Sequence, residues 1–285
     1  MKKLVNFVFI LFILTGIFQT PISANEVNND NKYYLIVNGR KWPRYVKTGE
    51  DINKMFWHTR NVIWEDDSKE KFREIVIPEG IKEIENLRLD ACEYLEKVTL
   101  PKGLKKIGTG AFEACRSLKT INIPNGVTEI GTDAFRDCKS LEYITIPDSV
   151  KEIEGGAFEN CTNLKSIILS NNITKINPYL FYNCISLEKV NIPNGVTAIY
   201  RAAFHNCTSL KTINIPNGVT FIGMSAFAYC RLKKITIPNS VKEIRIDWGG
   251  YYSDRFREPF YGTDTIYYNG KAKGSPWGAR QRLRY

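Results

Sequence analysis

Histidine is scarce in this chain, which has only His58 and His205 in 285 residues. Metal sites need clustered ligands, such as two cysteines separated by two residues, and the sequence contains no such pair. It also lacks a glycine-rich phosphate-binding loop and a serine-nucleophile motif. Catalysis is therefore poorly supported, and we predict a protein that is not an enzyme and that uses no metal or other cofactor.

Long apolar runs are also missing, with one exception near the N-terminus. Leu4–Phe18 is a run of 15 residues that follows Lys2 and Lys3 and precedes the small-residue stretch ending at Ala24. A membrane-spanning helix needs about 20 apolar residues, so this run fits an export signal better than an uncleaved anchor. No cysteine lies near Ala24, which argues against lipid attachment. We predict a signal peptide at 1–24 and no integral membrane segment after its cleavage.

Cysteine has an informative spacing. The seven cysteines lie 23 residues apart, which resembles a row of equivalent buried positions more than a disulfide framework. We expect inert core thiols. His205 stands two residues before Cys207, but we predict a solvent-facing helix residue beside an inert thiol and not a Cys–His catalytic pair. The row consists of Cys92, Cys115, Cys138, Cys161, Cys184, Cys207 and Cys230.

The 23-residue spacing belongs to a larger repeat, of which Ile121–Tyr143 is a clear copy. With Ile121 as position 1, positions 1 and 3 are apolar in every copy from Ile75 onward, which predicts a short half-buried strand. Proline follows at position 4 in all copies except the one with Ser170. Ala-Phe at positions 14 and 15, Cys at 18 and Leu at 21 predict one or two helical turns. Each unit buries its apolar face only by stacking on its neighbours.

The strand segment Leu118–Pro124, LKTINIP, has the spacing Leu-x-x-Ile-x-Ile. With IPNGV and AFxxC in a 23-residue unit, this region resembles the BspA-like branch of the leucine-rich repeat family. The resemblance implies an α/β-type repeat solenoid that is curved and capped at both ends, with short parallel strands on one face and short helices or turns on the other. It also implies adhesion or protein binding, and it supplies no active site.

Four regions follow from these patterns. We predict a signal peptide at 1–24, an N-terminal linker and cap at 25–72, the solenoid at 73–244, and a C-terminal insertion, cap and basic tail at 245–285. A strand is expected at Tyr33–Val37 and a last strand at Thr265–Tyr268. The period is broken twice: one residue is missing between Cys230 and Ile235, and 11 are inserted within 245–258.

Outward-facing strand positions are the first candidate binding site. Tyr143 and Ile168 fall on adjacent central strands among small polar residues such as Thr145 and Asn191. An exposed aromatic residue beside an exposed aliphatic one is typical of an interface, although the same residues also suit an ordinary solvated sheet. Position 22 alternates in charge along the stack, which favours correct register. Its residues are Arg73, Glu96, Lys119, Glu142, Lys165, Glu188, Lys211 and Lys233.

The insertion is the second candidate, for binding protein or glycan or for covering the last repeat. Its residues are Trp248, Tyr251, Tyr252, Arg255 and Phe256.

We therefore expect a secreted bacterial protein, extracellular or associated with the cell wall, that binds a protein of a host or neighbouring cell. The alternative is a structural protein held on an anionic wall polymer by its basic tail. A glycan partner stays open and no nucleic acid partner is expected. The tail carries Lys271, Lys273, Arg280, Arg282 and Arg284, and a solvated, frayed terminus is its simpler interpretation.

Overall fold

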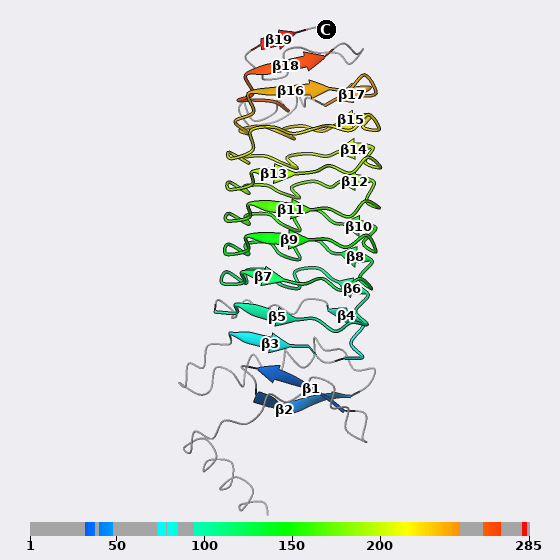
Figure 1. The fold of residues 1–285 in the computed structure, drawn as a ribbon, viewed down its shortest axis with the longest axis vertical. Coiled ribbons are helices and arrows are strands. Elements are labelled where there is room, and N and C mark those ends of the chain that lie inside the picture. The colour runs from blue at the N-terminus through cyan, green and yellow to red at the C-terminus, as the bar shows by residue number, and fades with distance from the viewer. Residues whose placement is uncertain are drawn as a thin grey trace, which may run out of the picture.

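The computed structural model describes residues 32–37, 40–47, 73–77, 79–84, 94–245, 259–268 and 281–283. These residues form a column of stacked coils, with β3 toward one end and β19 at the other (Figure 1). The coils follow a nearly straight axis in Figure 1, so the curvature that the resemblance implied is not seen. The outer surface of the first sheet is therefore called the strand face and not the concave face.

The strand face belongs to one short strand per coil. Buried and more exposed residues alternate along most of these strands, as in Tyr143-Ile144-Thr145, where only Ile144 is buried. From β3 to β7 and from β9 to β13, neighbouring strands are parallel and pair residues that are 23 apart, as in Ile75 with Val98, whereas β7 and β9 belong to separate sheets. The strands are β3 (Glu74–Val76), β5 (Lys97–Thr99), β7 (Thr120–Ile121), β9 (Tyr143–Thr145), β11 (Ser166–Ile168), β13 (Lys189–Val190), β16 (Lys234–Ile237), β18 (Thr265–Tyr268) and β19 (Gln281–Leu283).

A second row of two-residue strands forms another side of the column. Each of these strands ends with the apolar residue of position 10, and this residue is buried in all of them. In most of them the residue before it is exposed or half-exposed. These strands are also parallel and in register. They are β4 (Glu83–Ile84), β6 (Lys106–Ile107), β8 (Glu129–Ile130), β10 (Glu152–Ile153), β12 (Lys175–Ile176), β14 (Ala198–Ile199), β15 (Phe221–Ile222) and β17 (Glu243–Ile244).

Both ends of the first row are extended by further strands. The hairpin of β1 (Lys32–Val37) and β2 (Arg40–Lys47) adds to the edge of β3, because β1 pairs with β3 in antiparallel fashion. This confirms the strand predicted at Tyr33–Val37. At the other end β18 occupies the predicted range, but it is not the last strand, since β19 pairs with it. Residues 281–283 of the tail are therefore held in a sheet and are not frayed.

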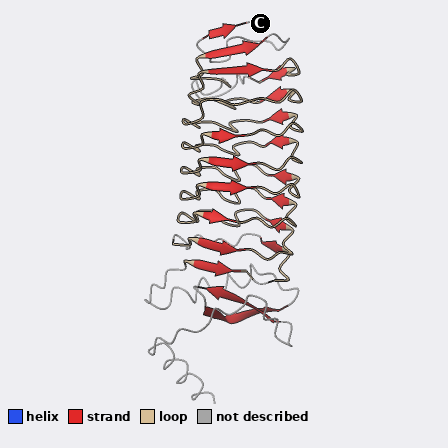
Figure 2. Ribbon diagram, in the orientation of Figure 1, coloured by secondary structure: helices blue, strands red, loops and turns tan. Residues whose placement is uncertain are grey.

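The third side of the column consists of turns, and no helix occurs among the described residues (Figure 2). The prediction of helical turns over positions 14 to 21 is therefore wrong, and backbone geometry explains why. Positions 13 and 17 have positive φ in successive coils, as at Asp133 (55°) and Asp137 (57°). A left-handed residue ends a right-handed helix. The N–H groups of positions 13, 15 and 17 instead donate to the next coil, as from Phe135 to Ala157 O at 2.8 Å.

Phenylalanine and cysteine form two rows in the core. The rings of position 15 stack along the column with centroids 5.3 to 5.8 Å apart, from Phe112 to Phe260. Each ring and each described cysteine has no solvent exposure. The cysteine thiol donates to a phenylalanine carbonyl of the preceding coil, as from Cys161 Sγ to Phe135 O at 3.1 Å. The coils from Phe112 to Cys230 are therefore held to their neighbours by side-chain hydrogen bonds and ring stacking as well as by backbone hydrogen bonds.

Candidate functional site

Two large apolar side chains are exposed on the strand face. Ile168 is 60% exposed and Tyr143 is 54% exposed, the highest values among the large hydrophobic residues in the described part of the chain. Thr145 and Asn191, the other predicted residues of this site, are also exposed. The structure therefore places all four on the surface on which the sequence placed them. Their role in binding stays a prediction.

The register fixes how Tyr143 and Ile168 lie relative to each other. Tyr143 pairs with Ser166, and Ile168 pairs with Thr145, so the two apolar residues stand at diagonal corners of β9 and β11. Strand and rung spacings put such corners roughly 8 Å apart. The Lys165 ammonium lies 5.7 Å from the centre of the Tyr143 ring and donates to Glu142 Oε2 at 2.7 Å. Because these contacts restrain the ring, the patch is partly ordered before any partner arrives.

Charged side chains beside this patch form the ladder expected at position 22. Glu96 bonds both Arg73 and Lys119, and Glu142 pairs with Lys165. The hydrogen bonds from Lys119 and Arg73 lower the pKa of the Glu96 carboxyl below that of a free glutamate. Since these groups are exposed, each ion pair contributes little to the stability of the fold. The ladder therefore favours correct alignment of neighbouring strands more than it stabilises the column.

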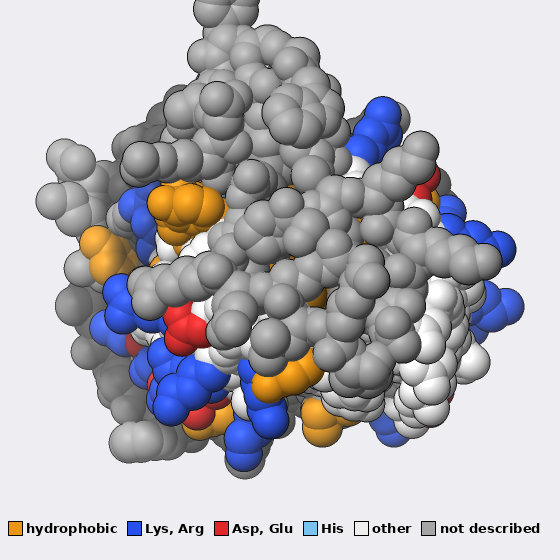
Figure 3. Space-filling model, turned by 90° about the horizontal axis from the view of Figure 1, so that it is seen from above, with side chains coloured by type: hydrophobic (Ala, Val, Ile, Leu, Met, Phe, Trp, Pro, Cys, Tyr) orange, Lys and Arg blue, Asp and Glu red, His pale blue; other side chains and the backbone are white. Residues whose placement is uncertain are grey.

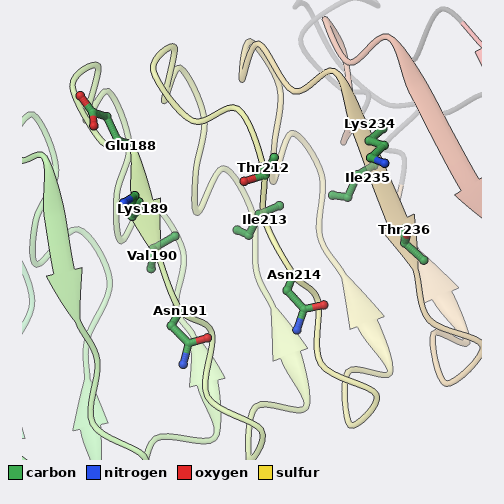
Figure 4. A pocket seen from close by; sticks show the side chains of 10 residues that line it. All are labelled: Glu188, Lys189, Val190, Asn191, Thr212, Ile213, Asn214, Lys234, Ile235 and Thr236. Atoms are coloured by element: carbon green, nitrogen blue, oxygen red, sulfur yellow. The ribbon is translucent and has the colours of Figure 1, made fainter.

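A hollow interrupts the strand face between β13 and β16, nearer the C-terminal end of the column. Residues 188–191, 212–214 and 234–236 line a hollow of about 420 Å³, which we call the seam (Figure 4). Its middle segment forms no strand, and the first row is therefore interrupted between β13 and β16. Val190 and Ile213 are half-buried here, whereas the equivalent Ile144, Ile167 and Ile235 are buried. Asn191 is one of the lining residues, so the predicted set reaches the edge of the seam.

The thiols offer no accessible chemistry. Cys115, Cys138, Cys161, Cys184, Cys207 and Cys230 are free and buried, which confirms the expected inert row for the described residues. Burial raises the pKa of the Cys138, Cys161, Cys184 and Cys207 thiols, since a thiolate loses its hydration there. Cys92 lies outside the described residues.

His205 departs from the expectation of a solvent-facing helix residue. It is 8% exposed, lies in a turn and stacks on the Tyr182 ring at 5.0 Å. Burial lowers the pKa of its imidazole, which favours the neutral form. Tyr182 holds the same position 16 one coil earlier and stacks on one side of the ring, and Tyr229, at position 17 of the next coil, contacts it edge-on. Tyr182, 23 residues before His205, was a signal in the sequence, and it indicates packing.

Thiol labelling tests the buried row. In a Cys92→Ser variant, the other six cysteines are expected to resist a small alkylating reagent in the native protein and to react fully after denaturation, because alkylation needs an exposed thiolate. Mass spectrometry before and after unfolding gives the count of modified residues. Rapid native modification of Cys207 would contradict this assignment and would restore the Cys–His interpretation.

Several sequence-based expectations fall on undescribed residues. Trp248, Tyr251, Tyr252, Arg255 and Phe256 of the insertion lie outside the described residues, as do the signal region and residues 48–72. The division of the chain into four regions stays a prediction. Within the described ranges, no group of three or more His, Cys, Asp or Glu residues is placed to hold a metal ion. The same ranges contain no helix with the length and apolarity that a membrane crossing requires.

Comparison with known proteins identifies the repeat. A family model described as BspA type leucine rich repeat region, present in six copies, matches residues 67–177 and 128–248. No curated protein matches.

Solved structures of three bacterial proteins are similar to this chain. A leucine-rich repeat protein from Bacteroides ovatus is 28% identical with a TM-score of 0.61, and the match covers 70% of this chain and 56% of that one. The leucine rich repeat protein of T. pallidum is 29% identical over 55% of this chain and 63% of its own, with a TM-score of 0.41. A leucine rich cell surface protein from Faecalibacterium prausnitzii is 30% identical over 61% and 60%, with a TM-score of 0.40.

Proposed function

Since the chain belongs to the BspA-type leucine-rich repeat family, we propose that its strand face binds another protein outside the cell. The observation that carries this proposal is the exposure of Tyr143 and Ile168 on adjacent strands. Exposed large apolar residues cost free energy in water, and clusters of them with polar surroundings are typical of protein interfaces. A rigid solenoid also suits binding, because a partner need not order the surface that it meets.

An extracellular location accords with the apolar run near the N-terminus and with the printed description of the Faecalibacterium relative as a cell surface protein. Adhesion to a host or neighbouring cell is the form of binding that we propose. Retention on an anionic wall polymer by the basic tail is the alternative, and it requires that Lys271, Lys273, Arg280, Arg282 and Arg284 reach the polymer.

A photo-crosslinking residue at Thr145 tests the proposed surface. Thr145 lies between Tyr143 and Ile168 on the strand face and is exposed, so a bound protein is expected to be captured there from host or neighbouring-cell surface fractions. The matched control is the same substitution at Thr197, an exposed threonine beside β14 on the second row of strands. Equal capture from both positions, or none from Thr145, would contradict binding by the strand face.

A further inference from the structure

The balance of charge changes along the column. Residues 94–159 contain nine Lys and Arg residues against ten Asp and Glu residues, whereas residues 160–245 contain ten Lys and Arg residues and only two acidic ones, Glu188 and Glu243. Figure 3 views the column from the C-terminal end and shows Lys and Arg side chains on several of its flanks. Charges of one sign add to a field that attracts the opposite sign, so residues 160–245 favour an anionic partner.

The seam is the hollow that lies within this basic part of the column. Its two outer coils each contribute an exposed lysine, Lys189 and Lys234. Neither lysine forms an ion pair with a carboxylate of the described residues, whereas Lys119 and Lys165 of earlier coils do. Two rung spacings, roughly 10 Å, separate the strand positions of the two seam lysines. The seam therefore offers two ammonium groups that acidic groups of one ligand can reach together.

Neutral polar side chains line the seam beside the lysines. The amides of Asn191 and Asn214 lie at the same end of their segments, on successive coils (Figure 4). Asparagines on successive coils bond to each other elsewhere, as from Asn183 Nδ2 to Asn160 Oδ1 at 2.9 Å, but within the described part of the chain Asn191 and Asn214 form no side-chain hydrogen bond. Their amide donors and acceptors are therefore available to a ligand. The four exposed neutral polar residues of the seam are Asn191, Thr212, Asn214 and Thr236.

Glu188 sets a requirement that negative charge on the ligand does not meet. Its exposed carboxylate only accepts hydrogen bonds, and it forms no ion pair with a described residue. A polyphosphate offers further acceptors, so it would leave this carboxylate and the asparagine carbonyls without donors. Hydroxyl groups both donate and accept hydrogen bonds. A ligand that carries hydroxyls as well as acidic groups therefore satisfies Glu188, the amides and the lysines together.

The lining also separates a sugar from a protein segment. Seven of its ten residues are polar, none is aromatic, and only Val190 and Ile213 present half-buried apolar surface. The centre of a protein interface is typically apolar or aromatic, and the pair Tyr143 and Ile168 has that character. The seam therefore suits a ligand whose own surface is mostly hydroxyl.

We infer that the seam binds an acidic polysaccharide. Its carboxylates lie at Lys189 and Lys234, its hydroxyls bond to Glu188 and to the asparagine amides, and its C–H groups cover the half-buried apolar residues. The site is separate from the pair Tyr143 and Ile168. It adds a ligand to the proposed protein partner and does not depend on that partner.

Matched oligomers test this site on the full chain. The probe is a dye-labelled oligomer of galacturonic acid, about four residues long, since roughly 10 Å separate the outer rungs. Its methyl ester keeps the hydroxyls and loses the charge, whereas a glutamate oligomer of the same length keeps the carboxylates and has no hydroxyls. In fluorescence anisotropy, the acid is expected to bind about tenfold more tightly than either control and than polyphosphate, because each control loses one of the two kinds of contact. Affinity for the acid is expected to fall as salt rises.

Substitution of the lysines locates the binding. Lys189→Gln with Lys234→Gln is expected to weaken binding of the galacturonic acid oligomer about tenfold, to the level of its ester, because two ion pairs are lost. The matched control is Lys151→Gln with Lys175→Gln, at exposed lysines near the second row of strands, and it is expected to leave the affinity unchanged. An unchanged affinity in the first variant, or no binding of the acid to the unsubstituted chain, would overturn the assignment.

Substitution of the asparagines tests the recognition of hydroxyls. Asn191→Ala with Asn214→Ala is expected to weaken the galacturonic acid oligomer about fivefold and to leave the glutamate oligomer unaffected, since only the sugar has hydroxyls for the amides. Equal or tighter binding of the glutamate oligomer by the unsubstituted chain would overturn the inference in favour of an acidic peptide. Equal or tighter binding of polyphosphate would overturn it in favour of a phosphate polymer. None of these outcomes alters the capture of a protein at Thr145, which tests the proposed function separately.

Discussion

Replacing Tyr143 and Ile168 together by alanine is expected to lower the affinity for the partner captured at Thr145 by about thirtyfold or more. Truncation of a central interface residue costs about 2 kcal/mol, and a factor of ten in affinity corresponds to about 1.4 kcal/mol. Tyr143 and Ile168 are the best candidates for such residues because they are large, exposed and placed on adjacent strands. The dissociation constant measured by surface plasmon resonance gives the effect directly.

The chain supplies a matched control for this double substitution. Tyr94 and Ile185 are 41% and 39% exposed and lie outside the strand segments. Their replacement by alanine removes the same two side-chain types, so it is expected to leave affinity unchanged. Both double variants should retain stability within about 1 kcal/mol, since exposed substitutions usually cost little. Similar losses of affinity in the two variants would show that the partner does not recognise the strand face.

Replacing Phe158 by alanine is expected to destabilise the column by about 3 to 5 kcal/mol, the usual cost of removing a buried phenylalanine side chain. Its ring has no solvent exposure and stacks between Phe135 at 5.4 Å and Phe181 at 5.8 Å. Its removal therefore leaves a cavity between two coils and breaks the row of rings at its centre. In a solenoid each coil contacts only its neighbours, so the loss of stability is expected to fall mainly on the coils on either side of Phe158.

Phe221 provides the comparison for this second prediction. It is half-buried in β15 and lies outside the row of stacked rings. Phe221→Ala is expected to cost less than half as much, about 1 to 2 kcal/mol, because the loss scales with the buried area removed. Circular dichroism during urea unfolding measures both. A cost for Phe158→Ala no greater than that for Phe221→Ala would show that the neighbouring coils close over the gap.

Much of the fold could be predicted because the repeat is local. The apolar residues at positions 1 and 3 predicted the strands, and the spacing of Cys115 to Cys230 predicted a buried row of thiols. The alternating charges at position 22 predicted cross-strand pairs such as Glu142 with Lys165. These predictions needed only one coil and its neighbour, and that is the range over which a solenoid makes its contacts.

The turn face was predicted less well, for a reason visible in the backbone. Steps of four and three residues between Ala134, Cys138 and Leu141 fit a helix as well as a series of turns. The difference lies at Asp133 and Asp137, whose φ angles are positive and whose N–H groups donate to the next coil. Asp and Asn tolerate this conformation, but Ala114 and Tyr179 adopt it too, so residue type alone did not indicate it. Stacking imposes it, because the next coil supplies the hydrogen-bond acceptors.

The sequence by itself determined the 23-residue coil, the buried rows of phenylalanine and cysteine, and the outward placement of Tyr143 and Ile168, because each depends on a repeated local pattern. The tertiary structure alone decided where the strand face opens. In the sequence, the missing residue before Ile235 and the like charges of Lys211 and Lys233 indicated only that the repeat changes there. They did not indicate that residues 212–214, between β13 and β16, form no backbone hydrogen bonds to either neighbouring coil in the described part of the chain. Pairing between strands depends on how whole coils stack on one another. A change of length in one coil therefore changes the strand pairing of the coils beside it.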